Sequence, residues 1–180
     1  NAITLAPFKL NGQDSVLYNG IKAQVIANQN ARKAFVKGFQ YKSIVTFSAA
    51  LSWETTVSQS YGRFTSSNGL QKPLDHIPPV FGRSALHYQK EALDWEFYVH
   101  FNGWKRIKDY NLDGEDNAQY ATPEGTPSWY TLNIRASYQL DKSLQMQGGI
   151  ENILDRNYRY FASGFSAPGR NVYLAIRVNF

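Results

Sequence analysis

The feature that most constrains how this chain can fold is a period-two alternation of apolar and polar residues. The clearest stretch runs from Val45 to Ser58, where apolar side chains fall on one face and polar ones on the other. Because successive side chains of a β-strand point to opposite faces, this pattern predicts strands. The apolar residues that share one face of that stretch are Val45, Phe47, Ala49, Leu51, Trp53 and Val57.

Further stretches follow the same rule and predict an all-β, antiparallel protein. They cover residues 95–102, 130–138, 144–151 and 172–180, and a less regular strand covers 81–89. Another strand is expected between Ile21 and Asn28. The segment from Ala31 to Tyr41 is also predicted as a strand, but Lys33 and Lys37 share a face with its aromatic residues. Its orientation therefore stays open.

Charged residues of the strands fall on the face opposite the apolar one. This holds for Glu54, Glu96, Arg135 and Arg177. A lipid-facing Arg or Lys at mid-membrane costs roughly 2–4 kcal/mol, so a transmembrane barrel would impose this distribution. A soluble sandwich also alternates, and alternation alone does not separate the two.

The lengths of the connections favour the membrane barrel. Tight breaks are expected near Lys42–Ile44, Lys90–Asp94 and Leu140–Ser143, and they alternate with long connections at 59–79, 105–128 and 152–171. Transmembrane barrels have short turns on one side and long loops on the other, whereas loops of ~20 residues are unusual in compact soluble domains. Tyr130 and Tyr138 lie eight residues apart on one face. That spacing corresponds to roughly 21 Å along the membrane normal, close to the separation of two aromatic girdles.

Composition removes several other classes. The sequence has no run of ~18 apolar residues, so a helical membrane span is not expected. The absence of cysteine excludes disulfides and thiolate metal sites. The net charge of +5 is scattered along the chain rather than clustered, which argues against nucleic-acid binding. No HExxH, GxSxG or P-loop pattern occurs, so neither an enzyme nor a cofactor is predicted. Because the chain begins at Asn1 without a signal peptide, we expect a fragment of a mature protein.

Four segments resemble one family, the TonB-dependent receptors. Residues 149–158 (GIENILDRNY) resemble its N-L-F-D-K-x-Y stretch, and residues 168–171 (PGRN), the alternating strand and Phe180 resemble its ending. Residues 74–79 (LDHIPP) with Gly82 resemble its P-L-x-x-I-P-P…G segment. Residues 30–39 (NARKAFVKGF) resemble its N-x-x-x-A-x-v-x-G-x-E segment, although Gln40 stands where an acidic residue is usual.

The resemblance implies a transmembrane barrel of 22 strands with a plugged lumen. Residues 1–180 would supply its C-terminal part, about seven or eight strands, without the plug domain, the TonB box or the earlier strands. It further implies a Gram-negative outer-membrane receptor that imports a scarce nutrient such as siderophore-bound iron, haem, cobalamin or a glycan. The implied partners are the TonB–ExbB–ExbD complex, outer-membrane lipid, a small-molecule or metal-chelate substrate and a surface substrate-binding lipoprotein. Phe180 would be part of the barrel-assembly signal or an interfacial anchor.

Several residues are candidates for contact with substrate or lumen. Glu96 and His100 share the polar face of one strand and would face the plug or the passage. His76 is either a metal ligand in an outer loop or a residue beside a structural turn. Tyr158, Arg159 and Tyr160 begin the last long loop and would form an aromatic wall for substrate or an interfacial girdle.

An acidic cluster surrounds Gly114 and allows two interpretations. Carboxylate-rich loops bind calcium, but the EF-hand spacing is missing, which favours a solvated loop. The members of the cluster are Asp109, Asp113, Glu115 and Asp116.

Two alternatives from other classes remain at this point. One is a small self-contained outer-membrane barrel acting as an adhesin or structural protein, which would have to close within this chain. The other is a soluble β-sandwich that binds carbohydrate and turns its apolar face inward.

Overall fold

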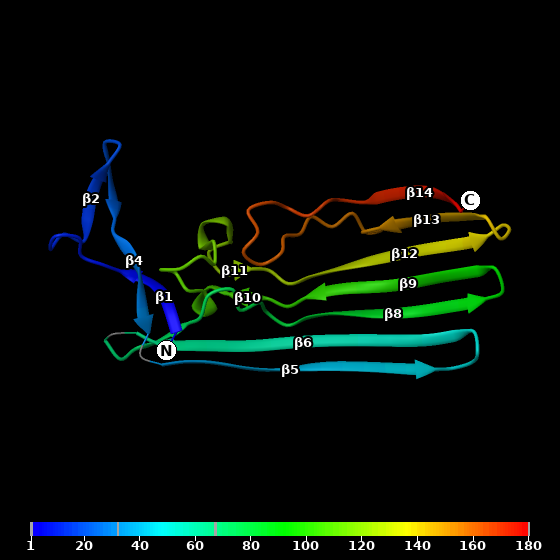
Figure 1. Cartoon of the computed structure of the whole chain (residues 1–180), viewed down its shortest axis with the longest axis horizontal. Helices are drawn as coiled ribbons and strands as arrows, with labels where there is room; N and C mark the ends of the chain where they lie inside the picture. The colour runs from blue at the N-terminus through cyan, green and yellow to red at the C-terminus, as the bar shows by residue number, and fades with distance from the viewer. Residues whose placement is uncertain (1, 32, 67, 180) are drawn as a thin grey trace.

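The computed structural model describes residues 2–31, 33–66 and 68–179, and its regular secondary structure is almost entirely β-strand (Figure 1). In the described residues, no helix has the length and apolarity that a membrane crossing requires. The strands are β1 (Ala2–Pro7), β2 (Ser15–Tyr18), β3 (Ile21–Gln24), β4 (Ile26–Ala31), β5 (Lys33–Thr46), β6 (Leu51–Thr65), β7 (Gln71–Pro73), β8 (Phe81–Lys90), β9 (Leu93–Asn102), β10 (Lys105–Arg106), β11 (Gly125–Thr126), β12 (Trp129–Gln139), β13 (Leu144–Glu151) and β14 (Asn171–Val178). Two 3-10 turns, η1 (Ile107–Asp109) and η2 (Ala118–Tyr120), lie in the loop between β10 and β11.

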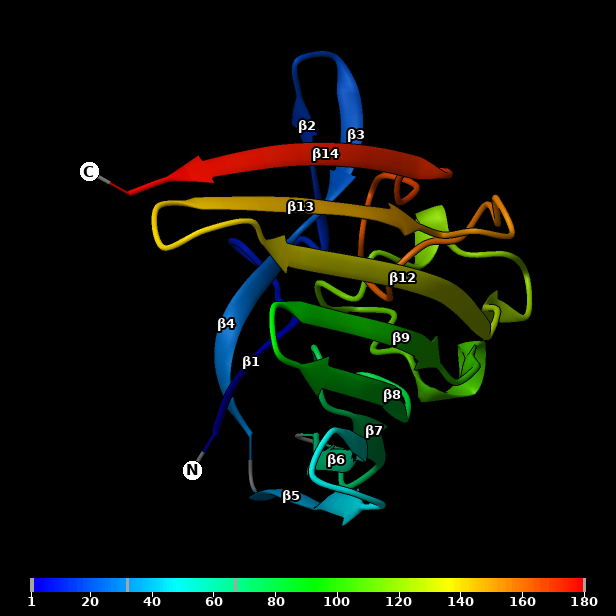
Figure 2. The ribbon, with the colours of Figure 1, turned by 90° about the vertical axis from the view of Figure 1, so that its right-hand side faces the viewer.

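The main sheet is an eight-stranded antiparallel meander. Its order is β14-β13-β12-β9-β8-β6-β5, and the short β7 pairs with β6 beside this path. Figure 1 shows the tight turns at one end of these strands and the long loops at the other. Figure 2 shows the strands stacked from β14 to β5 as an open sheet. Within the described residues β5 and β14 each pair on one side only, so the sheet does not close into a barrel by itself.

The register places the two kinds of side chain on opposite faces, as the alternation predicted. One cross-strand row of the apolar face joins Tyr41, Val57, Gly82, Phe101 and Tyr130. The next row, on the polar face, joins Thr56, Arg83, His100 and Thr131. The predicted strands at 81–89, 95–102, 130–138 and 144–151 are confirmed with the predicted faces.

The apolar face is uncovered. Val172, Leu174 and Ile176 are 68%, 72% and 63% exposed, and Ile134 is 38% exposed. In the described part of the chain, no second sheet packs across this face. An exposed apolar surface of this extent is unfavourable in water and suits contact with acyl chains. The alternative of a soluble sandwich with its apolar face turned inward is therefore wrong.

One predicted strand is corrected by the structure. Residues 45–58 do not form a single strand, because the chain reverses between β5 and β6 at residues 47–50. Ser48 stabilises this turn: its Oγ accepts hydrogen bonds from the amides of Ala50 (3.2 Å) and Leu51 (3.1 Å). The break expected near Lys42–Ile44 lies inside β5. Phe47 and Ala49 continue the alternation of apolar and polar residues through this turn. The sequence pattern therefore gave no sign of the turn.

The orientation of β5 is settled by its pairing with β6. Val45 lies opposite Trp53 and Tyr41 opposite Val57, so Phe35, Phe39 and Tyr41 belong to the apolar face. Lys33 and Lys37 share that face, since they have the same parity along an unbroken strand.

The N-terminal segment projects beyond the long-loop end of the sheet (Figure 1). β1 pairs with β4, and β2 with β3. Asn19 and Gly20 join β2 to β3 with φ of 49° and 78°, the pair of positive angles that a two-residue hairpin turn needs. The strand expected between Ile21 and Asn28 is divided here into β3 and β4.

Candidate functional site

A charged triad lies at the centre of the polar face. Glu96 of β9 is flanked by Arg83 of β8 and Arg135 of β12, whose guanidinium nitrogens lie 2.6 and 2.7 Å from Glu96 Oε2. The Tyr98 ring lies beside them, 4.4 Å from the Arg83 guanidinium carbon and 5.7 Å from that of Arg135. The Glu96 side chain is only 9% exposed. Its charge is therefore neutralised by the two arginines.

His100 lies four residues further along β9, toward the long loops. It pairs with Arg83 across β8 and β9, and its ring centroid is 5.1 Å from that of Tyr98. Glu96 and His100 thus share one face, as the sequence predicted. They differ in surroundings, because Glu96 is held in the ionic triad whereas His100 lines an open recess.

This recess has a volume of about 760 Å³, within the range of small-molecule sites. It lies where the polar face of β5, β6, β8 and β9 meets Pro78, Tyr160 and Phe161 of the long loops. Its lining combines aromatic rings, cations and neutral hydrogen-bonding groups. The side chains that give it this character are Phe81, Trp129, Tyr160, Phe161, Lys42, Arg83, His100, Gln40 and Asn102. Such a surface suits a ligand that carries both flat apolar groups and acceptor oxygens.

Trp129, the first residue of β12, anchors the last long loop. Its ring centroid lies 4.2 Å from that of Tyr158 and 4.9 Å from that of Tyr160. Its Nε1 donates to the carbonyl of Arg159 (3.0 Å), and the Arg159 guanidinium donates to the carbonyl of Tyr120 (2.6 Å). Burial raises the pKa of Tyr158 to about 12, so this phenol stays neutral. Of the predicted aromatic wall, Tyr160 reaches the recess, while Tyr158 and Arg159 fix the loop.

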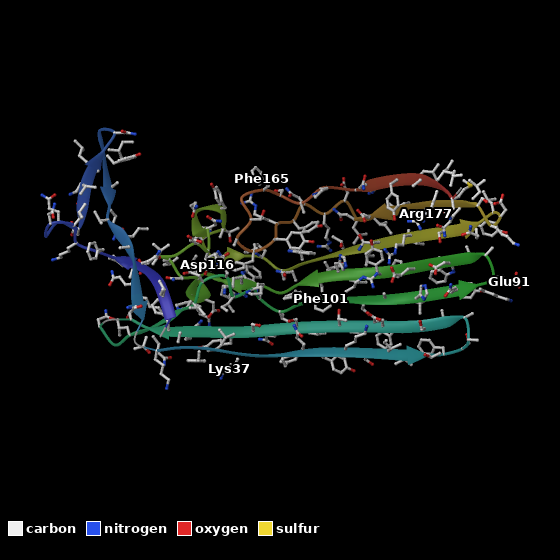
Figure 3. All side chains as sticks on the ribbon, in the orientation of Figure 1. Lys37, Glu91, Phe101, Asp116, Phe165 and Arg177 are labelled. Atoms are coloured by element: carbon white, nitrogen blue, oxygen red, sulfur yellow. The ribbon has the colours of Figure 1, made fainter. Side chains whose placement is uncertain are left out.

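The loops between β6 and β8 and between β9 and β12 are joined by buried polar groups. Asp116 is fully buried and accepts hydrogen bonds from the backbone amides of His76 (2.8 Å) and Asn111 (2.9 Å). Lys105 is 5% exposed and donates to the carbonyl of Ile77 (2.5 Å). Burial lowers the pKa of the Lys105 ammonium. Figure 3 shows Asp116 among these loops, at the end of the sheet opposite Glu91.

Three members of the acidic cluster are held by the fold, which corrects the interpretation as a solvated loop, whereas Glu115 is exposed. Asp109 pairs with Arg63 at 2.7 Å, and Asp113 contacts Lys72. Asp116 is buried as described above. In the described ranges no group of three or more His, Cys, Asp or Glu is arranged to hold a metal ion.

His76 lies at the edge of the same network rather than in the recess. Its backbone has a φ of 58°, and its exposed ring lies 4.0 Å from a Glu115 carboxylate oxygen. The turn interpretation describes its place better than metal ligation. Phe180, the expected assembly signal, falls outside the described residues.

Lys42, Phe81, Arg83 and Trp129 line the recess, but the sequence did not single them out as site residues. Their shared signal was available: each is a polar-face position, and Phe81, Arg83 and Trp129 lie near the long-loop end of their strands. To find the recess from this signal, one must know the register between the strands, which the sequence alone did not supply.

An open antiparallel meander with one exposed apolar face, tight turns at one end and long folded loops at the other defines a segment of a transmembrane β-barrel. The sequence profile described as "TonB dependent receptor-like, beta-barrel" matches residues 2–153. The chain therefore belongs to the TonB-dependent receptor family, as the sequence resemblance predicted.

Individual relatives agree with this membership. The ferric enterobactin receptor PirA of Pseudomonas aeruginosa is 23% identical over 184 residues, which cover 98% of this chain and 24% of that protein. A probable TonB-dependent receptor of Bordetella pertussis, BfrD, is 31% identical over 75 residues, or 39% of this chain and 9% of that protein. This chain thus spans at most about a quarter of the curated relatives' length.

Solved structures show the same fold. The copper transporter OprC superposes with a TM-score of 0.76 at 14% identity, covering 99% of this chain and 28% of that one. The ferric enterobactin receptor PfeA of Pseudomonas aeruginosa gives 0.65 at 18% identity, covering 100% and 27%. The ferric yersiniabactin receptor FyuA of Yersinia pestis gives 0.61 at 19% identity, covering 86% and 25%.

Proposed function

We propose that the protein to which this chain belongs is an outer-membrane receptor that imports a metal chelate, with siderophore-bound iron as the favoured substrate. Residues 1–180 would form the C-terminal part of a 22-stranded barrel, whose other strands and plug lie outside this chain. The observation that carries the proposal is the aromatic and cationic recess at the long-loop end of the polar face. A ligand arriving from outside the cell would meet this surface first.

In this proposal each face of the sheet has its own task. The apolar face contacts lipid, and the polar face lines the lumen around the plug. The long loops and the recess receive the substrate, and the TonB–ExbB–ExbD complex acts on the plug to open a path. The Arg83–Glu96–Arg135 triad would present a fixed arrangement with a net charge of +1 to that path, because two arginines share one glutamate. A surface lipoprotein that delivers substrate remains a further proposed partner.

The choice of substrate rests on the chemistry of the recess and on the relatives. Lys42 and Arg83 lie beside the rings of Phe81, Trp129 and Tyr160. Aryl rings of a ligand would stack on these aromatics. Its anionic oxygens would compete for Lys42 and Arg83 with Glu54 (3.1 Å) and Glu96 (2.6 Å), which pair with these cations in the structure. The relatives and structural neighbours include receptors for ferric enterobactin and ferric yersiniabactin and a copper transporter. An iron chelate of the siderophore type, with aryl rings, is therefore favoured over haem, cobalamin or a glycan.

The experiment is an uptake assay with the full-length receptor in an outer-membrane strain that lacks its own iron-chelate receptors. Radioactive iron would be offered as catecholate, phenolate and hydroxamate chelates, with haem, cobalamin and an oligosaccharide as competing candidates. We expect uptake of at least one aryl-bearing chelate, lost when the TonB protein is deleted and lowered by Trp129→Ala. Uptake of cobalamin or glycan alone, or uptake that persists without TonB, would contradict the proposal.

A further inference from the structure

Lys105 of β10 carries a buried charge that no carboxylate pairs. The residue is 5% exposed, and in the described part of the chain no carboxylate oxygen lies within 4.0 Å of its Nζ. Asp116 and Asp109 act on this charge only from farther away. Removal of an ammonium group from water is unfavourable unless other groups replace its hydration. The groups that replace it here are a backbone carbonyl and aromatic rings.

These groups belong partly to the two neighbouring long loops. The Lys105 Nζ donates to the carbonyl of Ile77 (2.5 Å), which lies in the loop between β6 and β8. It also lies 4.7 Å from the ring centroid of Phe161, in the loop between β13 and β14. A cation within about 6 Å of an aromatic centroid is attracted by the ring face, more strongly where water is excluded. One ammonium group therefore binds both neighbouring loops to the loop between β9 and β12.

Phe161 is held from a second side by Tyr110. Their ring centroids are 5.3 Å apart with an interplanar angle of 83°, an edge-to-face arrangement. Tyr110 is 3% exposed, and its hydroxyl shares a 2.6 Å hydrogen bond with that of Thr126, the cross-strand partner of Lys105. Lys105 and Tyr110 thus form a seat for the Phe161 ring, and both belong to the loop between β9 and β12.

The backbone that follows Phe161 indicates that its position is imposed by this neighbouring loop. Ala162 has a φ of 62°, in the left-handed region that a residue with a Cβ adopts only at an energetic cost. Its carbonyl accepts a hydrogen bond from the side-chain amide of Asn117 (2.8 Å). Strained backbone persists where surrounding contacts determine it. The contacts that do so here are the bond from Asn117 and the seat of the ring.

The seated ring is part of the wall of the recess. Phe161 lines the recess, and so does Pro78, which directly follows the residue whose carbonyl Lys105 binds. Lys105 itself lies behind this lining and does not face the recess. The same ammonium group therefore supports both of the loops that border the recess.

We propose that Lys105 is a positioning residue for the recess: its charge holds the Phe161 ring and the Ile77–Pro78 segment in place before a ligand enters. The proposal rests on the proposed function in taking the recess as the substrate site. A wall that is already ordered loses little freedom when a ligand binds. Loss of the charge should therefore free Phe161 and weaken binding, although Lys105 makes no contact with the ligand.

The test is a double-mutant cycle in the full-length receptor, with Lys105→Met, Phe161→Leu and both together. Met keeps most of the length of lysine without its charge, and Leu keeps apolar bulk without a ring. The Kd for ferric enterobactin is measured by quenching of tryptophan fluorescence, and amide exchange is measured on peptides that cover residues 158–165. We expect Lys105→Met to raise Kd and to speed this exchange by about tenfold each. With Phe161→Leu already present, Lys105→Met should change each quantity by less than about twofold.

Two control variants separate the charge from general stability of the loops. Lys105→Arg keeps a cation and a donor, so its Kd should stay within about twofold of the wild-type value. Lys72→Met removes a lysine that joins two of the same loops through Asp113 rather than through Phe161, and it should leave Kd unchanged.

Three results would overturn the proposal. The first is an equal effect of Lys105→Met with and without Phe161→Leu, or no effect in either background. The second is a loss in Lys105→Arg as large as that in Lys105→Met, and the third is an equal loss in Lys72→Met. Failure of the wild-type receptor to bind the chelate, with coupled exchange at residues 105 and 161, would count against the proposed function alone. Binding with uncoupled exchange would count against the role of Lys105 alone.

Discussion

Removal of the Asp116 carboxylate should release the two loops that it joins. Asp116 is fully buried and accepts the amides of His76 and Asn111. In Asp116→Ala both donors lose their acceptor, and each buried unsatisfied donor costs about 1–3 kcal/mol. Because the freed loops can rehydrate, we expect a loss near the low end of the sum, about 2–3 kcal/mol. Since 1.4 kcal/mol is a factor of ten, amide protection should fall about 30- to 150-fold.

Hydrogen exchange of the full-length receptor in lipid nanodiscs measures this directly, through peptides that cover residues 70–80 and 105–117. Asp141→Ala is the matched control, because Asp141 also accepts two backbone amides, those of Ser143 (2.7 Å) and Leu144 (3.0 Å), but in an exposed turn at the other end of the sheet. Its effect should stay within the β12–β13 turn. Unchanged exchange of both loop peptides in Asp116→Ala would refute the reasoning that this carboxylate joins them.

Other predictions follow from the same contacts. Because the pKa of Tyr158 is raised to about 12 from 10.0, its contribution to loop stability is present below pH 10 and is lost as pH rises from 10 toward 12. Tryptophan fluorescence should report that opening, and Tyr158→Phe should remove it. Glu96→Gln leaves Arg83 and Arg135 without their anion and should destabilise the barrel by about 1–3 kcal/mol, seen as a lower midpoint of heat unfolding. Trp129→Phe keeps most of the ring packing but loses the hydrogen bond to Arg159, so it should weaken substrate binding less than Trp129→Ala.

Asp75 is expected to behave in the opposite way to Asp116, because its charged carboxylate does not stabilise these loops. Burial raises the pKa of Asp75, so its charged form is penalised in the fold. Its stabilising contribution is therefore largest below its unfolded pKa and is lost as pH rises through the raised folded value. Asp75→Asn should leave loop protection at neutral pH unchanged or higher, measured on the same peptides. A loss as large as that in Asp116→Ala would contradict this assignment.

The face of most strands could be predicted from the sequence even where a turn was misplaced, whereas the first part of β5 needed its pairing with β6. The β5–β6 turn lies at residues 47–50 instead of near 42–44, yet Val45 and Trp53 were correctly assigned to one face. The reason is that they are direct cross-strand partners, and partners across a register without a bulge share a face. The turn itself was hidden because Ser48 stabilises it through a side-chain bond that needs neither Gly nor Pro.

The recess could not be predicted in the same way, because its residues meet only through the fold. Lys42 and Tyr160 lie 118 positions apart in the sequence, and no local pattern relates them. The same is true of Asp116, which looks like one more acidic loop residue until His76 and Asn111 are brought to it. Alternation specifies which side chains face the lumen. Which of them converge depends on cross-strand register and on loop packing, and those are the two properties that a period-two pattern does not encode.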